Sequence, residues 1–462
     1  MRRALENLEE HKRELVNTLD LLLEQGPDSR GLIQNLLTGL HPADVADVLD
    51  VMDADDAGRV IVFLDHGTAS DVLAEMEEET RAPLLGLLEV GRLASLVEAM
   101  DSDDATDLVA DMDAYRAEEV LEQVDPEDRR EIRDLMVYDE ETAGGLMAAE
   151  FVAVPETATV DGAIEAIRTA VEEMDDIYYV YVVNAAGMLT GLLGLKDLLL
   201  APPDRHVGDL MERDVVSVPV TMDQEEVARV VQQYDLAAVP VVDGGGRLVG
   251  RITHDDIVDV LEEESEEDIR RMAGVREEAF YERSSMKVAA LRLPWIVTSL
   301  VSSLLAALII SLNSSLLERF VQLAFFFPVI TAIGGNIGLQ TSTIMVRGLA
   351  TGQTDLMHVG SRILKESRVG VVMGLVCGVV VGTVSGFWAG GLVFGLIVGG
   401  AMLVAILVAA TMGAIVPLVF EKVGVDPAVA TGPFVTMSND LIGLLIYFGL
   451  AAGLLTAFGL MV

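Results

Sequence analysis

The residue with the clearest chemical potential is Asp440, a carboxylate inside an otherwise apolar segment near the end of the chain. A charge within a bilayer costs on the order of 3 kcal/mol by insertion scales, so acids at that depth usually face a bundle interior or a water-filled path. A protonated Asp bonded to a neighbouring helix, or a misplaced span edge, is the alternative. We take Asp440 as a candidate cation ligand.

Two polar clusters accompany this acid. Residues 328–343 place Pro328, three glycines and several polar side chains in one apolar stretch, and residues 431–440 set Gly432 and Pro433 before Asp440. Broken helix in a membrane is tolerated only where protein or a water-filled cavity meets the freed backbone groups. Both segments are therefore predicted to be irregular and to line a pore, with close packing through small residues as the alternative. The pore-lining candidates are Asn336, Gln340, Thr436 and Asn439.

A single carboxylate suits a hydrated cation better than a bare one. Mg2+ binds oxygen ligands, keeps several of its waters and is commonly held by one or two carboxylates. In a two-fold dimer, two copies of Asp440 would face each other and would repel without a divalent cation between them. We therefore predict Mg2+ as the ion, while the dimer is a hypothesis at this point.

Four apolar stretches, at residues 294–312, 320–346, 369–420 and 433–462, are candidates for membrane spans. The third would form a helix of about 78 Å at about 1.5 Å per residue, much longer than a bilayer is thick. It must fold back, and residues 388–391 (Trp-Ala-Gly-Gly) are the expected turn. The sequence thus predicts a helical membrane domain with five spans, surrounded by lipid.

Charge is divided unevenly along the chain. The whole sequence has a formal net charge of −43, and residues 1–283 hold 23 Lys or Arg against 68 Asp or Glu. Basic residues near the span ends lie mostly on one side of the predicted membrane domain. They are Lys287, Arg292, Arg347, Arg362, Lys365, Arg368 and Lys422, against Arg319 on the other side. This bias predicts a cytoplasmic N-terminal half and an extracytoplasmic C-terminus in a cell membrane.

Residues 151–262 contain an internal repeat of about 60 residues, in which 152–155 (VAVP) aligns with 216–219 (VSVP). Each copy alternates β-branched runs with helical periodicity, which is typical of an α/β unit. The pair resembles tandem CBS modules. Such modules often bind adenine nucleotides through a Thr or Ser and an Asp three residues later, and Thr253 and Asp256 fit. ATP is therefore a possible modulator, while the absence of a Walker-type loop predicts no ATP hydrolysis.

Residues 1–145 read as helices throughout. At each expected helix start, a capping residue or Pro is followed by acids in the first turn of the helix. Such starts are seen at residues 41–44, 53–56, 101–104 and 125–128. Their repetition predicts a short superhelix of stacked helices. The fold class is thus multidomain: an all-α superhelical N-terminal domain, α/β tandem CBS modules and a five-span helical membrane domain.

The whole chain resembles the MgtE family of magnesium channels. The resemblance rests on residues 334–342 (GGNIGLQTS), on 347–350 (RGLA), and on Asp426-Pro427 leading to 432–436 (GPFVT) and Asp440. It implies a homodimeric Mg2+-selective channel with Asp440 at the position of the family's pore aspartate. It also implies domains at 1–145, 146–205, 206–262, 263–286 and 287–462, with 263–286 as a charged plug helix that closes the pore.

The same resemblance implies a set of acidic regulatory Mg2+ ligands in the cytoplasmic half. These are Asp103, Asp107, Asp223, Asp235, Asp256, Asp259, Glu264, Glu267, Asp268 and Asp426. Because the chain has only five lysines and abundant acids, a solvated surface suited to high salt is the alternative for any one of them. Collectively, we expect some of these acids to bind metal.

The expected function is a Mg2+ uptake channel that cytoplasmic Mg2+ closes, because the bound ion bridges acidic faces that otherwise repel. We expect no catalytic residues, no enzymatic activity and no nucleic-acid partner. Two alternatives remain open: a membrane-anchored CBS-type sensor of Mg2+ or nucleotide that conducts nothing, and a transporter of Mn2+ or Co2+, since hard oxygen sites discriminate only weakly against those metals.

Overall fold

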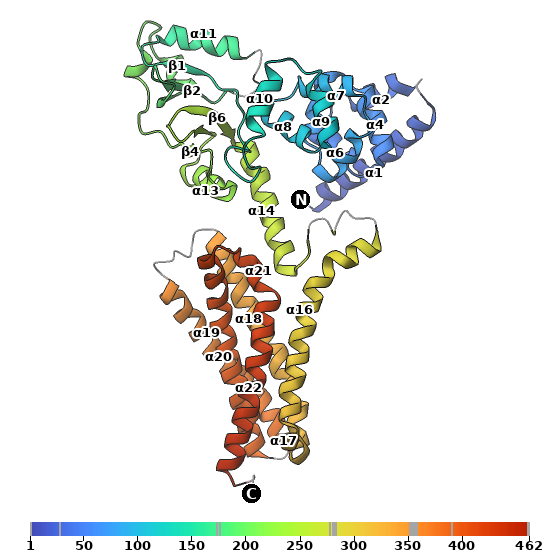
Figure 1. Cartoon of the computed structure of the whole chain (residues 1–462), viewed down its shortest axis with the longest axis vertical. Helices are drawn as coiled ribbons and strands as arrows, with labels where there is room; N and C mark the ends of the chain where they lie inside the picture. The colour runs from blue at the N-terminus through green and yellow to red at the C-terminus, as the bar shows by residue number, and fades with distance from the viewer. Residues whose placement is uncertain are drawn as a thin grey trace. The chain divides into compact units, whose positions relative to one another are not determined.

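The computed structural model describes residues 2–26, 29–171, 174, 177–276, 279, 284–350, 359–389 and 391–459. The chain divides into two compact units, Met1–Glu262 and Glu263–Val462. The first combines helices with two small sheets, and the second has helices joined by short loops, with no strand among its described residues (Figure 1). Each unit is considered separately below.

Ten short helices open the first unit and confirm the predicted superhelix. They are α1 (Arg2–Glu24), α2 (Arg30–Leu37), α3 (Pro42–Leu49), α4 (Ala54–Phe63), α5 (His66–Ala74), α6 (Glu78–Leu85), α7 (Val90–Val97), α8 (Ser102–Ala110), α9 (Ala114–Leu121) and α10 (Asp128–Leu135). The expected starts are confirmed for α3, α4 and α8, which follow His41, Asp53 and Asp101. One continuous apolar core joins these helices.

Arginines tie three helices of this array to the helix three positions earlier. Arg59 of α4 donates to the carbonyl of Leu23 in α1 at 2.7 Å. Arg92 of α7 donates to the carbonyl of Leu64, the residue after α4, at 2.9 Å. Arg116 of α9 donates to the carbonyl of Leu85, the last residue of α6, at 3.0 Å. Carbonyls at helix C-termini lack intrahelical donors and carry partial negative charge, so the cations satisfy both needs. Stacking is thereby fixed by cations in an otherwise acidic domain.

The predicted repeat forms two three-stranded sheets of identical topology. In each, the first strand pairs parallel with the second and the second antiparallel with the third. The irregularity in register falls at equivalent places, Val182/Val183 and Val241/Val242. The first copy comprises β1 (Ala153–Pro155), α11 (Val160–Ala170), β2 (Tyr179–Val183), β3 (Leu189–Gly194) and α12 (Leu195–Leu200). The second follows η2 (Val207–Asp209) and comprises β4 (Val218–Pro219), α13 (Gln224–Tyr234), β5 (Ala238–Val242), β6 (Leu248–Thr253) and the start of α14 (His254–Ala273).

Helix α14 crosses the boundary between the two units at residues 262/263. We expected a charged helix continuing to about Met286, and this was wrong: α14 ends at Ala273. Gly274 adopts φ +67°, a left-handed conformation that commonly ends helices at glycine. The remaining part of the predicted segment at 277–278 and 280–283 lies outside the described residues.

The second unit has five helical segments long and apolar enough to cross a membrane, as predicted. They are Ser285–Leu312, Val321–Leu349, Gly360–Trp388, Leu392–Val423 and Pro427–Ala457. The corresponding elements are α16 (Ser285–Leu312), α17 (Ser314–Arg319), η3 (Val321–Phe325), α18 (Phe327–Ala350), α19 (Val359–Ala389), α20 (Leu392–Val423), α21 (Pro427–Thr431) and α22 (Pro433–Ala457). The long third stretch does fold back, at Gly391, whose φ is +106°.

The prediction of a broken helix at residues 328–343 was wrong. Residues Phe327–Ala350 form one continuous α-helix. Pro328 lies in its first turn, where a missing N–H breaks no intrahelical hydrogen bond. The irregular backbone precedes the proline, as the 3-10 helix η3. The last span does break where expected, at Gly432 between α21 and α22.

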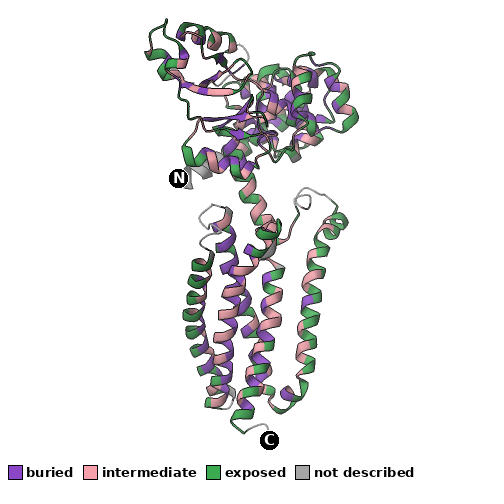
Figure 2. Ribbon diagram, turned by 60° about the vertical axis from the view of Figure 1, so that its left-hand side comes forward, coloured by how far each residue is buried: buried purple, intermediate pink, exposed green. Residues whose placement is uncertain are grey.

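Small residues allow the spans to pack closely. A methyl group on Gly378 of α19 would lie 2.7 Å from the carbonyl oxygen of Gly399 in α20, and one on Gly382 would lie 2.8 Å from that of Gly395. Without bulk between them, two backbones approach closely, which favours helix association in lipid. Helix α20 has the largest buried share of the five spans among the described residues (Figure 2).

Candidate cation sites

Asp440 lies in the second turn of α22, after the break at Gly432, and is partly buried within the chain. Three of the four pore-lining candidates are exposed: Asn336 and Gln340, one turn apart on α18, and Thr436, one turn before Asp440 on α22. The two helices adjoin here, since a methyl group on Gly335 would lie 3.7 Å from Thr436 Cγ2. The membrane unit thus has polar side chains at an exposed face.

Asn439, the fourth candidate, lies elsewhere. Its side chain is only 3% exposed, and its Nδ2 has no hydrogen-bond partner among the described residues. The amide packs against the glycines of α18, because a methyl group on Gly334 would lie 3.0 Å from Nδ2. The structure therefore separates Asn439 from the exposed polar face on which the other candidates lie.

In the first unit, acids of α8 and α14 form an acidic cluster. Burial raises the pKa of Asp103 well above its usual range, and repulsion from Asp104 and Asp256 adds to the effect. Burial also raises the pKa of Asp104 to about 7, again with Asp256 as a contributor, while Arg81 opposes the shift. Acids far apart in sequence therefore share one weakly neutralised environment.

Asp256 and Asp259 are the α14 members of this cluster. The pKa of Asp259 rises to about 6, first through burial, then through repulsion from Asp256 and Glu75. Asp256 also has a raised pKa from burial, although two hydrogen bonds from Thr253 work against the shift. Such a set of oxygen ligands, with a surplus of negative charge, fits a divalent cation chemically.

Three other predicted ligands have different surroundings. Asp223 and Asp235 are exposed at opposite ends of α13: Asp223 caps the helix by accepting from the N–H of Glu225 at 3.0 Å, and Asp235 ends it with φ +53°. Asp107 is exposed one turn after Asp103 on α8 and adds to the repulsion felt by Asp104. Asp223 and Asp235 therefore each have a structural role at an end of α13.

In the second unit, the C-terminal part of α14 meets the loop before α21. Burial raises the pKa of Asp268 to about 6, with repulsion from Asp426 and Glu264 as further causes. Asp426 caps α21 by accepting from the N–H of Ala428 at 2.7 Å. Its other oxygen accepts from Arg271 Nη1 at 2.5 Å.

Arg271 also pairs with Glu267, one turn earlier on α14. One guanidinium thus contacts two of the acids that were predicted as metal ligands. Local sequence pattern does not predict this pairing, because Arg271 and Asp426 are 155 residues apart.

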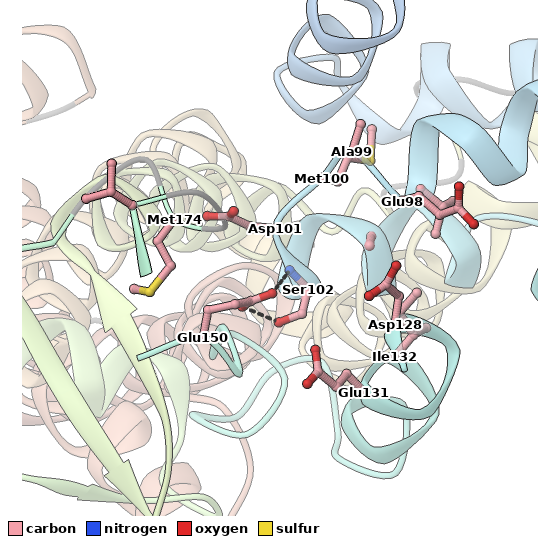
Figure 3. A pocket seen from close by; sticks show the side chains of 13 residues that line it. Glu98, Ala99, Met100, Asp101, Ser102, Asp128, Glu131, Ile132, Glu150 and Met174 are labelled. Carbon is pink, nitrogen blue, oxygen red and sulfur yellow. Dashed lines mark hydrogen bonds between the residues drawn. The ribbon is translucent and has the colours of Figure 1, made fainter. Parts of the chain in front are cut away.

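An acid-lined pocket of about 360 Å³ lies in the first unit, among α7, α8, α10 and the first CBS module (Figure 3). Its acids are Glu98, Asp101, Asp128, Glu131 and Glu150. The N–H and Oγ of Ser102 donate to the two oxygens of Glu150, at 3.1 and 2.7 Å. The pKa of Asp128 is raised by burial and then by neighbouring acids, among them Glu98 and Glu150.

Sequence reasoning missed Asp104 and this pocket. Asp104 was interpreted only as a first-turn acid that complements a helix dipole, although it follows the candidate Asp103 directly. The pocket residue Glu150 had no sequence signal, because Ser102, which holds it, is 48 residues away. Among the described residues, no group of three or more His, Cys, Asp or Glu is arranged to hold a metal ion by itself.

The nucleotide candidates lie at the junction of β6 and α14. Both the N–H and the Oγ1 of Thr253 donate to Asp256 Oδ2, at 2.8 and 2.6 Å. In the first copy Gly194 takes the place of the threonine, and a methyl group on it would lie 3.4 Å from Asp197 Oδ2. The two copies therefore share this geometry, but only the second has the hydroxyl.

Family models match most of the chain. A model described as a divalent cation transporter (MgtE) matches residues 327–450. The MgtE intracellular N domain matches residues 40–141, and the CBS domain matches 143–204 and 207–263.

Whole-protein relatives extend these matches, one of them over nearly the full length of this chain. The magnesium transporter MgtE of Bacillus subtilis (strain 168) is 32% identical over 440 residues, 95% of this chain and 97% of that protein. The magnesium transporter MgtE of Thermus thermophilus is 36% identical over 331 residues, 71% of this chain and 73% of that protein. A crystal structure of the cytosolic domain of the Mg2+ channel MgtE in complex with ATP is 35% identical, with a TM-score of 0.50, and covers 53% of this chain and 99% of that one.

The raised pKa of Asp128 predicts a pH dependence of stability. A carboxyl group whose pKa is higher in the folded state binds its proton more tightly there, so its stabilising effect is complete below 3.8 and is lost as pH rises through the folded pKa. In EDTA, we expect the unfolding temperature of the full chain in detergent to fall with rising pH. Asp128→Asn should make this fall shallower, because the proton held more tightly in the folded state is lost.

A matched control is Asp55→Asn, which removes an exposed acid from the first turn of α4, just as Asp128 lies in the first turn of α10. It controls for the loss of a first-turn acid as such. Equal slopes for Asp128→Asn and the wild type in differential scanning fluorimetry would contradict the expectation.

Proposed function

The chain belongs to the MgtE family of magnesium transporters, and on that basis we propose that it is a Mg2+-selective channel for magnesium uptake, closed by cytoplasmic Mg2+. Membership itself rests on the alignment over 95% of the chain. The domain boundaries at 1–145, 146–205, 206–262, 263–286 and 287–462 belong to the same proposal. Family members are transporters, which leaves no role for an enzymatic active site.

The exposed polar face of the membrane unit is the observation that carries the pore proposal. Asn336, Gln340 and Thr436 are exposed on helices that are mostly apolar, and Asp440 lies one turn after Thr436. Polar and charged side chains are expensive against lipid, so such a face requires either protein or water opposite it. A water-filled path between two copies of the chain would place water opposite this face.

In the proposed homodimer, the two Asp440 carboxylates lie on either side of the path. A hydrated Mg2+ between them would be attracted by both charges while keeping its waters. The cytoplasmic position of the first unit and the extracytoplasmic C-terminus rest on the basic residues near the span ends. With that orientation, a membrane potential negative inside drives the cation inward at about 2.3 kcal/mol per charge per 100 mV.

The gate proposal assigns regulatory Mg2+ to the acidic clusters. In the first unit, Asp103, Asp256 and Asp259 would supply ligands, with Asp104 as a further member. In the second unit, Glu264, Glu267, Asp268 and Asp426 would do so beside Arg271. Bound Mg2+ supplies positive charge that lowers the repulsion between acids. Asp107, Asp223 and Asp235 stay in the proposed set, with the least structural support.

The segment after the CBS modules is proposed to close the pore. Its described part, the end of α14, contacts the loop before α21 through the ion pair of Arg271 with Asp426. Asp426 is followed by α21 and the break at Gly432, and Asp440 lies eight residues beyond the break. A movement of this end of α14 can therefore reach the pore helix through directly connected elements.

The alternatives are weighed by specific observations. A sensor without conduction leaves the exposed polar face unexplained and is disfavoured by full-length relatives that are named transporters. Transport of Mn2+ or Co2+ remains a competing reading of the ion, because an all-oxygen site discriminates weakly among these metals.

ATP is proposed as a modulator that binds the second CBS module. The support is the hydrogen-bonded pair of Thr253 and Asp256, together with the ATP complex formed by the similar cytosolic domain. Asp256 also belongs to the acidic cluster of α8 and α14. A nucleotide bound there would share a residue with a proposed Mg2+ ligand set.

Asp440 provides the test of the pore. Mg2+ uptake into proteoliposomes at low internal Mg2+ should fall about tenfold or more in Asp440→Asn, since the ion loses its charged ligand. Glu318→Gln, which removes an exposed acid outside the spans, should conduct like the wild type. Mn2+ uptake measured in the same vesicles distinguishes a Mg2+ channel from a Mn2+ transporter. No Mg2+ uptake by folded wild-type protein, or full uptake by Asp440→Asn, would refute the proposed pore.

Thr253 provides the test of nucleotide binding. In Thr253→Ala the hydroxyl is lost, so the Kd for ATP of the full chain in detergent should rise about tenfold, as measured by isothermal titration calorimetry. Thr169→Ala, at an exposed position on α11 of the first module, should bind ATP with the wild-type Kd. Wild-type protein without measurable ATP binding, or equal Kd values for both variants, would reject the assignment.

A further inference from the structure

Two side chains of α22 fill two glycine sites on α18. Asn439 lies against Gly334, and Val435, one turn earlier, lies against Gly338: methyl groups on these glycines would come 3.0 Å from Asn439 Nδ2 and 3.0 Å from Val435 Cγ1. Both side chains are buried, Val435 at 0% and Asn439 at 3% exposure. The two contacts, Asn439 with Gly334 and Val435 with Gly338, are separated by four residues on each helix. Together they determine how α22 is rotated about its own axis relative to α18.

That rotation determines where the pore candidates point. Thr436 and Asp440 each directly follow one of the two buried residues, so each side chain is turned by about 100° around the helix from its neighbour. Accordingly, Thr436 is exposed and Asp440 is only partly buried. If α22 turned or moved away from α18, the Asp440 carboxylate would move with it.

The chemistry of Asn439 needs its own account, because a buried amide without a partner is unfavourable. Among the described residues its Nδ2 is inaccessible and makes no hydrogen bond. A leucine at position 439 would have a similar length and no unpaired donor. Its Cγ, however, is tetrahedral and carries two methyl groups, whereas the Cγ of asparagine is the planar amide carbon. Next to Gly334, where a single methyl group would already come within 3.0 Å, a flat group permits the closest approach of the helices.

We propose that Asn439 is a positioning residue for Asp440: its flat amide, seated against Gly334 and Gly338, sets the distance and rotation of α22 relative to α18 and thereby aims the carboxylate that selects the ion. This inference rests on the proposed channel function and deepens it. Asn439 acts through Asp440 and does not itself contact the ion.

Steric complementation tests the inference. Gly334→Ala adds a methyl group 3.0 Å from Asn439 Nδ2, so the amide must shift by a few tenths of an ångström. We expect Mg2+ uptake to fall about tenfold and the ratio of Mg2+ to Mn2+ uptake to fall about threefold. Combining Gly334→Ala with Asn439→Ala removes the amide that must shift. The double variant should therefore recover uptake and the ion ratio to those of Asn439→Ala alone.

Gly443→Ala is the matched control. Gly443 lies on the same helix, α22, and a methyl group on it would have no neighbour within 4 Å among the described residues. It should keep both the uptake and the ion ratio of the wild type. Thermal unfolding of each purified variant separates loss of fold from misdirection of Asp440. If Gly334→Ala does not fold, the pair Gly338→Ala with Val435→Ala supplies the same complementation on the neighbouring contact.

The outcomes separate this inference from the function on which it rests. Wild-type protein that takes up no Mg2+ would refute the channel itself. Wild-type uptake with additive losses in the double variant, or with an ion ratio unchanged in Gly334→Ala, would refute the positioning role alone. An ion ratio that falls in Gly334→Ala and recovers in the double variant would support it.

Discussion

Negative charge that lacks nearby positive charge is the constraint on which this structure depends. In the first unit, burial raises the pKa of Asp103 and Asp104 on α8 and of Asp256 on α14, and repulsion from Asp256 raises the pKa of Asp103 and Asp104 further. Of the few cations, Arg59, Arg92 and Arg116 reach helix C-termini and hold the helical array together. Arg81 and Arg251 lower the pKa of Asp104 and Asp256, but burial outweighs them, so the pKa of both acids stays raised. A divalent cation would relieve that repulsion directly.

The membrane unit solves a different problem, which is to hold one acid in an apolar environment with little polar support. Close packing does this work: glycine contacts join α19 to α20, and the paired contacts of Asn439 and Val435 with Gly334 and Gly338 join α22 to α18. Small residues permit such approach where no hydrophobic driving force acts between helices. Asp440 is thereby fixed in direction beside an exposed polar face.

Much of the architecture could be predicted from local pattern. The repeat predicted two equivalent sheets, and the overlong apolar stretch predicted a turn near Gly391, because length and periodicity are properties of adjacent residues. Local pattern failed at Pro328, whose effect depends on its place within the helix, and at Gly274, which ends α14 early. It also failed wherever partners are distant in sequence, as for Arg271 with Asp426 and Ser102 with Glu150. Whether Asn439 faced the pore or a glycine depended on the rotation of a whole helix, which periodicity in an almost uniformly apolar segment does not define.

The central claim is that Mg2+ on the side of the acidic unit closes the path past Asp440. The most direct measurement is the conductance of the full chain in a planar bilayer, with Mg2+ varied only on that side and the Mg2+ gradient for flux supplied from the other. The account predicts that conductance falls about tenfold as this Mg2+ rises from micromolar to millimolar levels, a typical size for coupling between sites. Conductance that is independent of Mg2+ on the acidic side would contradict it.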